Sequence, residues 1–129
     1  DKEENREKAI SILRDLGLEK YIDKHPFALS RGEKQRLTIA CGMMKNAKVF
    51  LYDEPTSGCD RESMTAVSTL IKKQIQKGIT VLIISHDFEF LSMVADELLL
   101  MEKGKIVQQT EYNAVQAEKA FEYIRSEIA

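Results

Sequence analysis

Residues 49–55 read Val-Phe-Leu-Tyr-Asp-Glu-Pro, an apolar run that ends in two adjacent acids. The run is too short for a helix and is bounded by turn-forming residues, which is typical of a buried strand. Carboxylates at the carboxyl end of a parallel strand lie in the crevice where α/β proteins bind ligands. Asp53 and Glu54 are therefore candidates for a metal ligand and for a group that faces a nucleophile. The alternative is that both are solvated residues of a strand-to-turn junction.

The residues after this strand predict a strand–helix–strand unit. Asp60 is suited to cap a helix, and Gly78 ends it before a second apolar strand at 79–84. The unit, residues 49–84, has the length of a crossover between parallel strands. We therefore expect an α/β fold with a buried, mainly parallel sheet. The apolar stripe of the helix is expected at Met64, Val67, Leu70, Ile71 and Ile75.

Further helices and a hairpin are predicted on either side of this unit. Residues 4–16 carry apolar residues three and four apart, and so does a helix that begins near Ser30. We expect residues 1–47 to form a helical portion and residues 48–129 the α/β portion of one partial domain. The expected stripe of the second helix is Leu37, Ala40, Cys41 and Met44. The later elements are expected at 88–95 (helix), 97–101 and 105–109 (hairpin strands) and 113–128 (helix).

The start of the second helix, residues 29–36, reads Leu-Ser-Arg-Gly-Glu-Lys-Gln-Arg. Ser30 and Glu33 have the spacing of a capping box, in which each satisfies a free backbone N–H. A helix N-terminus with a hydroxyl, and with Gly32 to let a backbone approach closely, also suits a phosphate. The pattern alone leaves both interpretations open.

His86 follows the second predicted strand, in the sequence Ser-His-Asp at 85–87. Consecutive parallel strands of one crossover unit are often neighbours, so their carboxyl ends lie at one edge of the sheet. We therefore expect His86 to lie near Asp53 and Glu54. The alternative is a surface histidine with no functional role.

The overall charge favours no polyanionic partner. The sequence has 19 basic and 21 acidic residues, a formal net charge of -2, so no nucleic-acid partner is expected. The apolar runs have the length of strands and are far shorter than the roughly 18 residues of a membrane helix. The charged amino-terminal residues lack the apolar core of a secretion signal, which predicts a cytoplasmic protein.

Together, these segments resemble the ABC ATPase family in order and spacing, from about residue 28 to residue 107. The resemblance implies a partial P-loop NTPase fold and ATP with Mg²⁺ as cofactors of the complete protein. It also implies that Asp53 is the Walker B acid of the magnesium site, that Glu54 is the catalytic glutamate that orients water, and that His86 is the switch histidine that senses the γ-phosphate.

The same resemblance assigns residues 29–33 to the signature motif and residues 57–60 to the D-loop. In the family two ATP-binding domains meet head to tail, as a homodimer or heterodimer. Ser30, Arg31, Gly32, Glu33 and Asp60 would then lie at the nucleotide shared with the second domain. Two residues depart from the family pattern: Arg31 replaces the usual first glycine of the signature, and Glu33 replaces the usual glutamine.

The Walker A phosphate-binding loop is absent from these 129 residues. Such a loop needs Gly-x-x-x-x-Gly-Lys followed by Ser or Thr. Gly104-Lys105 has Leu99 in place of the first glycine and Ile106 after it. We therefore expect the parent protein to be an ATPase and the isolated chain to be inactive.

Within the family, residues 53–64 and 101–104 look most like the ATP-binding subunits of energy-coupling-factor importers, which take up vitamins or metal ions. This implies a transmembrane transporter subunit as partner and a peripheral location on the cytoplasmic face of the cell membrane. The alternatives are an ABC ATPase that moves no solute, such as a translation or chromosome-maintenance factor, and a catalytically dead interaction module.

Overall fold

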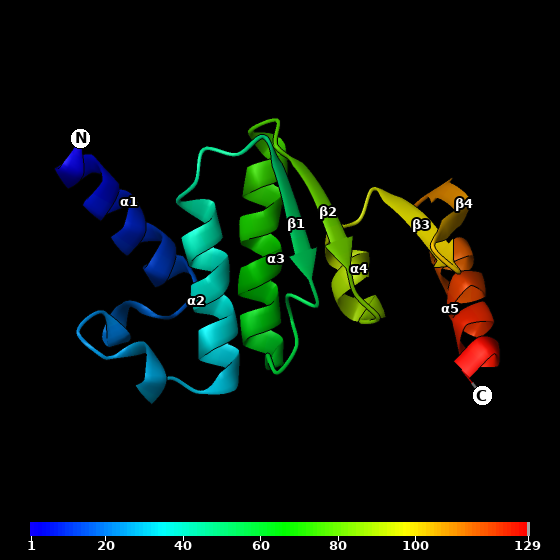
Figure 1. Cartoon of the computed structure of the whole chain (residues 1–129), viewed down its shortest axis with the longest axis horizontal. Helices are drawn as coiled ribbons and strands as arrows, with labels where there is room; N and C mark the ends of the chain where they lie inside the picture. The colour runs from blue at the N-terminus through cyan, green and yellow to red at the C-terminus, as the bar shows by residue number, and fades with distance from the viewer. Residues whose placement is uncertain (129) are drawn as a thin grey trace. The chain divides into compact units, whose positions relative to one another are not determined.

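The computed structural model describes the backbone of residues 1–128, which divide along the sequence into two compact units, with the boundary between Phe90 and Leu91 (Figure 1). The first unit contains α1 (Lys2–Asp15), short 3₁₀ turns at Glu19–Tyr21 and Pro26–Ala28, α2 (Arg31–Met43), β1 (Val49–Asp53), α3 (Arg61–Gln76) and β2 (Thr80–Ile84). The chain continues through α4 (Phe88–Val94) into β3 (Glu97–Glu102), β4 (Lys105–Glu111) and α5 (Ala114–Ile128). The functional division predicted between residues 47 and 48 stays a prediction.

In the first unit β1 and β2 pair in parallel, as the strand–helix–strand pattern predicts. Side chains alternate along a strand, so Phe50 and Tyr52 lie on one face of the sheet. Their paired neighbours in β2 are Val81 and Ile83. Phe50 and Tyr52 are both buried, and α3 packs against the strands with its apolar stripe. The core of the unit therefore lies between this face of the sheet and α3.

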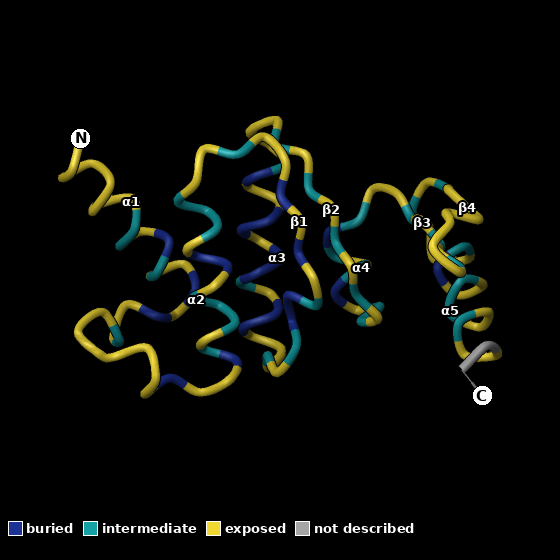
Figure 2. The backbone as a smooth tube through the Cα atoms, viewed as in Figure 1, coloured by how far each residue is buried: buried dark blue, intermediate teal, exposed yellow. Residues whose placement is uncertain are grey.

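The other face of the sheet is open, which corrects the prediction of a buried sheet (Figure 2). Val49 and Leu51 are each 63% exposed, and Leu82 and Ile84 of β2 are 47% and 51% exposed. These side chains are as apolar as the buried ones, so the sequence pattern correctly reads as a strand with two apolar faces. Within the described residues, however, helices cover only one of them.

The caps predicted for α3 are confirmed. The Asp60 carboxylate accepts a hydrogen bond from the Ser63 backbone N–H at 2.8 Å, which satisfies a free donor of the first turn. After the last turn, Gly78 adopts a φ of 78°, a left-handed conformation that glycine reaches without steric cost. The chain can therefore turn directly from α3 into β2.

The buried face of α2 differs from the predicted stripe. Ile39 and Ala40 are buried, whereas Cys41, which we expected inside, is exposed. Successive residues of a helix are about 100° apart around its axis. The inner face of α2 follows Gly32, Ile39 and Ala40, so Cys41 is rotated out of the core. The apolar pattern of the sequence is wide enough to fit either rotation.

The second unit contains the predicted hairpin. β3 and β4 are antiparallel, and Glu102 pairs with Lys105 across a two-residue turn. Both turn residues, Lys103 and Gly104, have positive φ values, of 46° and 78°, as a type I′ turn requires. This pair forms a sheet separate from β1 and β2, which the sequence did not predict. No helix in the described part of the chain is long and apolar enough to cross a membrane.

The open face of the β1–β2 sheet predicts self-association of the purified chain. Exposed apolar side chains and unpaired strand edges favour pairing with a second copy. We expect the sedimentation coefficient to rise with concentration, and Leu51→Thr to weaken this rise because it removes apolar surface from the centre of the face. Lys72→Thr, at an exposed position of α3, is the control. A parent chain that stays monomeric at high concentration would contradict the prediction.

Candidate functional site

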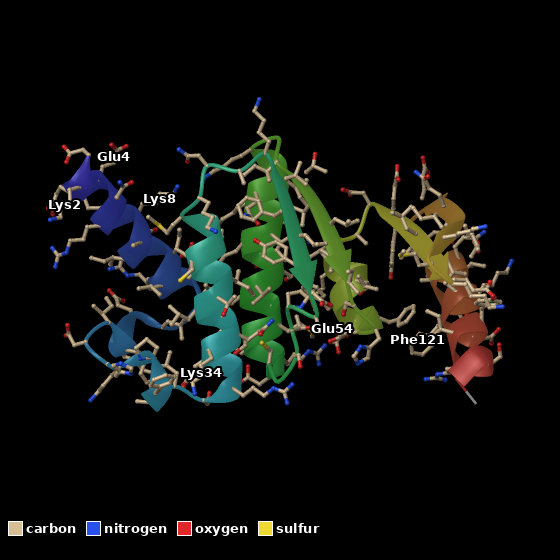
Figure 3. The ribbon with its side chains drawn as sticks, in the orientation of Figure 1. Lys2, Glu4, Lys8, Lys34, Glu54 and Phe121 are labelled. Atoms are coloured by element: carbon tan, nitrogen blue, oxygen red, sulfur yellow. The ribbon has the colours of Figure 1, made fainter. Side chains whose placement is uncertain are left out.

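The candidate site lies where β1 and β2 end. The Glu54 backbone N–H donates to the Ile84 carbonyl oxygen at 2.8 Å, so the segment after β1 is still hydrogen-bonded to β2 one residue beyond the end of β1. Glu54, labelled at the end of β1 in Figure 3, therefore leaves the sheet beside the end of β2, and His86 follows β2 by two residues. This is the carboxyl edge at which the sequence places the site.

Glu54 has a φ of 47°, in the left-handed region that residues other than glycine rarely adopt. Such a conformation costs on the order of 1–3 kcal/mol and persists only where surrounding contacts fix it. Here the Glu54 carbonyl oxygen accepts hydrogen bonds from the Ser57 backbone N–H at 3.1 Å and from the Gln35 side-chain amide at 3.2 Å. The backbone at Glu54 is thus bent sharply and held from two directions.

The bend brings the Glu54 carboxylate to His86. The distance between Glu54 Oε1 and His86 Nδ1 is 2.7 Å. An ionised carboxylate can only accept, so Nδ1 carries the proton and donates. The His86 side chain is 86% exposed and that of Glu54 33%, so the pair is open to a ligand. The predicted proximity of Glu54 and His86 is confirmed, whereas their catalytic roles stay predictions.

A second contact ties the same two loops together. The Thr56 hydroxyl donates to Asp87 Oδ2 at 3.4 Å, and Asp87 Oδ1 accepts from the Phe90 backbone N–H at 3.0 Å. Thr56 belongs to the loop after β1 and Asp87 to the loop after β2. The two loops that carry Glu54 and His86 therefore have a fixed relation to each other.

Asp53, the predicted magnesium ligand, is the exposed last residue of β1. By the alternation of the strand it lies on the open face of the sheet with Val49 and Leu51. No group of three or more His, Cys, Asp or Glu side chains in the described part of the chain is placed to hold a metal ion. Magnesium is commonly held by one or two carboxylates together with substrate phosphates and water. An exposed single carboxylate fits that mode of binding, in which a nucleotide completes the coordination.

The capping box at the start of α2 is present, and a tyrosine extends it. Ser30 Oγ accepts from the Glu33 backbone N–H at 3.3 Å, and Glu33 Oε2 accepts from the Ser30 backbone N–H at 2.8 Å. The other oxygen, Glu33 Oε1, accepts from the Tyr21 hydroxyl at 2.6 Å. The Tyr21 hydrogen bond, followed by that of the Ser30 backbone, lowers the pKa of Glu33. No spacing in the sequence identifies Tyr21 as this partner.

The same helix start lies against the loop that follows Glu54. A Cβ atom on Gly32 would come within 2.5 Å of the Gly58 carbonyl oxygen, so only glycine fits there. The neighbouring Arg31 donates from its guanidinium to Ser57 Oγ at 3.3 Å. Gly32 does permit a close backbone approach, and the backbone that approaches it is that of Gly58. The predicted contacts of Ser30, Arg31 and Gly32 with a phosphate stay predictions.

The end of this loop is held by Asp60 and Arg36. Asp60 caps α3, and its hydrogen bond with the Ser63 side chain, followed by that with the Ser63 backbone, lowers the pKa of Asp60. The Arg36 guanidinium, from α2, donates to the Ser63 hydroxyl. The carboxylate predicted to face a nucleotide is therefore already engaged at a helix start. Arg36 and Gln35 were not predicted, although both lie one helical turn beyond Arg31 and Gly32 on the same helix.

Comparison with known proteins identifies the family. The ABC transporter family profile matches residues 1–57. The L-cystine import ATP-binding protein of Bacillus subtilis is 38% identical over 109 residues, which cover 84% of this chain and 44% of that protein. The glutamate/aspartate import ATP-binding protein of Escherichia coli is 34% identical over 114 residues, which cover 88% of this chain and 47% of that protein.

The chain belongs to the ABC transporter ATP-binding family. A solved dimeric bacterial ABC transporter cassette matches its fold with a TM-score of 0.75 at 26% identity, over 88% of this chain and 50% of that cassette. The predicted family and the partial P-loop NTPase fold are thus confirmed. The matches do not single out the energy-coupling-factor importers, because the named solutes of the relatives cited above are amino acids. This ABC chain spans under half the length of those two relatives.

The Tyr21–Glu33 contact predicts a pH-dependent contribution to stability. Because folding lowers the pKa of Glu33, its carboxylate stabilises the fold above the ordinary pKa of glutamate, and this contribution is lost as the pH falls below about 4.3. We expect Tyr21→Phe to raise the Glu33 pKa, measured by NMR titration of the side-chain carboxyl carbon. Glu33→Gln should lose less stability on acidification than the parent.

The exposed Glu7, in the middle of α1, is the matched position: Glu7→Gln should follow the parent in urea unfolding at each pH. An unchanged Glu33 titration in Tyr21→Phe would show that the tyrosine does not set this pKa.

Proposed function

We propose that the complete subunit containing this chain binds and hydrolyses ATP and couples hydrolysis to solute transport. The observation that carries the proposal is the Glu54–His86 pair, 2.7 Å apart at the carboxyl ends of two parallel strands. In α/β proteins this edge is where ligands bind. An acidic group beside a histidine, both open to solvent, suits the orientation of a water molecule toward a phosphate.

Each residue of the pair has a distinct task in this proposal. Glu54 uses one carboxylate oxygen for His86, which leaves the other to accept a hydrogen bond from the attacking water and orient it. His86 donates from Nδ1 to Glu54. As an imidazolium, with Nε2 protonated too, it would also donate from Nε2 on the opposite side of its ring to a γ-phosphate oxygen. The hydrogen bond between them fixes both side chains before a nucleotide binds.

Asp53 is the residue that would hold Mg²⁺. Bound there, the ion would neutralise phosphate charge that develops during phosphoryl transfer. Asp53 and Glu54 are adjacent in sequence, but the bend at Glu54 sends the backbone in a new direction between them. The two carboxylates can therefore serve a metal and a water molecule separately.

The start of α2 is proposed to bind the nucleotide of a second ATP-binding domain that packs head to tail with this one. Ser30 offers a hydroxyl and the first turn of α2 offers backbone N–H groups, both suited to phosphate oxygens. Arg31 adds a positive charge at this end. The dimeric cassette among the related structures supports the dimer. The partner could be an identical or a different domain.

The proposed assembly includes a transmembrane transporter subunit, with the ATP-binding subunit on the cytoplasmic face of the membrane. The names of the relatives support this partner and favour import of amino acids over the vitamins or metal ions first expected. The same names favour a role in transport. They argue against an ABC ATPase that moves no solute and against an inactive interaction module. Transport by the reconstituted complex, driven by ATP, would test the assignment.

The isolated chain of 129 residues is expected not to hydrolyse ATP. It has no Gly-rich loop and lysine to hold the β- and γ-phosphates, on which phosphoryl transfer depends. A phosphate-release assay with magnesium and ATP should show no turnover above that of buffer. Turnover that disappears in Glu54→Gln would contradict this expectation.

In the complete subunit, Asp53→Asn and Glu54→Gln are expected to fail differently. Asp53→Asn removes charge from the metal site, so it should weaken magnesium-dependent ATP binding as well as turnover. Glu54→Gln keeps the shape and the metal site but removes the group that orients water, so it should bind ATP and turn over at least about a hundredfold more slowly.

Equilibrium ATP binding and single-turnover hydrolysis separate the two variants. Hydrolysis at the parent rate by Glu54→Gln would show that Glu54 is not the catalytic carboxylate. Equal loss of ATP binding in both variants would show that the two carboxylates do not have separate roles.

A further inference from the structure

One face of α2 contacts the loop between β1 and α3 at several residues, and also the first turn of α3. Arg31 bonds to Ser57, and Gly32 lies against Gly58. One turn further along, Gln35 bonds to the Glu54 carbonyl oxygen and Arg36 bonds to Ser63. Residues four apart lie on the same side of a helix, so these four residues form a continuous surface. We call residues 31, 32, 35 and 36 the clamp face of α2.

Gln35 contacts the loop at Glu54, the residue with the left-handed backbone. The Glu54 carbonyl oxygen also accepts from Ser57, but that bond lies within the loop and moves with it. Within the described residues, the hydrogen bond to this oxygen from outside the loop comes from the Gln35 side chain. The peptide after Glu54 is therefore tied to α2, while the peptide before it is tied to β2 through Ile84.

These two ties determine where the carboxylate points. Glu54 has a φ of 47°, and its backbone would relax toward ordinary values if the peptide on either side were free to rotate. Rotation about the Glu54 backbone would carry the carboxylate away from His86, whose Nδ1 is 2.7 Å from Oε1. The hydrogen bond from Gln35 opposes this rotation.

We propose that Gln35 is a positioning residue that holds Glu54 in its left-handed conformation and so aims the carboxylate at His86 and the attacking water. The inference rests on the proposed function of Glu54 as the group that orients water. Gln35 touches neither reacting atom in this proposal. It acts through the main chain of Glu54.

The other residues of the clamp face confine the effect of losing the Gln35 hydrogen bond to Glu54. Arg36 holds the start of α3 through Ser63, and the close packing of Gly32 on Gly58 fixes the middle of the loop. Loss of the Gln35 bond leaves these contacts in place. We therefore expect the loop to stay folded in a Gln35 variant and the orientation of Glu54 alone to loosen.

The test uses Gln35→Met in the complete subunit, since methionine keeps the length of the side chain and removes the donor. We expect kcat for ATP hydrolysis to fall about three- to tenfold, the rate equivalent of one hydrogen bond, with KM for ATP and the unfolding temperature close to those of the parent. Gln76→Met, at the exposed end of α3, is the matched control and should leave kcat unchanged.

A double-mutant cycle with Glu54→Gln separates positioning from a general structural role. If Gln35 acts through the Glu54 carboxylate, Gln35→Met should lower single-turnover hydrolysis in the parent and have little further effect in the Glu54→Gln background. Equal fold-losses in both backgrounds, or a loss that appears in KM or in the unfolding temperature, would overturn the inference.

The roles of Gln35 and Glu54 can be tested separately. Normal kcat in Gln35→Met together with a large loss in Glu54→Gln would overturn the role of Gln35 and leave the proposed function intact. Normal hydrolysis by Glu54→Gln would overturn the catalytic assignment of Glu54 and, with it, the inference about Gln35.

Discussion

The left-handed backbone of Glu54 is the constraint on which the candidate site depends. A φ of 47° at a glutamate is unfavourable by itself, so neighbouring elements must hold it. Pairing to β2 holds one side of the residue, and α2 holds the other. The result is a carboxylate that leaves the strand end toward His86 instead of continuing the direction of β1. Strain of this kind is common where a side chain must be held for chemistry.

The same constraint connects two regions that have separate proposed roles. The start of α2 is proposed to bind the nucleotide of a second domain, and Glu54 is proposed to act beside the nucleotide of its own domain. Arg31, at that start, also contacts the loop that leads from Glu54 to α3. A shift of α2 on nucleotide binding would therefore change the position of the Glu54 carboxylate, through side chains already in contact.

The sequence predicts well those features that depend on local spacing. The parallel strands, the capping box of Ser30 and Glu33, and the cap at Asp60 follow from residues a few positions apart. The approach of His86 to Glu54 follows from one topological rule. The orientation of α2 that exposes Cys41 could not be predicted, because the apolar residues of this helix fit two different buried faces.

The contacts that the sequence does not predict join elements distant along the chain. The hydrogen bond from Gln35 reaches across 19 positions to Glu54, and no periodicity encodes such a pair. The open face of the β1–β2 sheet differs from these contacts, because its apolar character is visible in the sequence. The sequence pattern indicates two apolar faces, and the described residues cover one of them. This chain spans under half the length of the relatives described above, and in it the open face of the β1–β2 sheet is exposed.

We propose that ATP is hydrolysed at the carboxyl edge of β1 and β2. A crystal structure of the complete subunit with magnesium and a slowly hydrolysed ATP analogue tests it most directly. We predict that Glu54 keeps its left-handed backbone and that its free carboxylate oxygen lies within hydrogen-bonding distance of a water in line with the γ-phosphate. A γ-phosphate bound elsewhere, or a Glu54 carboxylate turned away from that water, would contradict the proposed role of this edge.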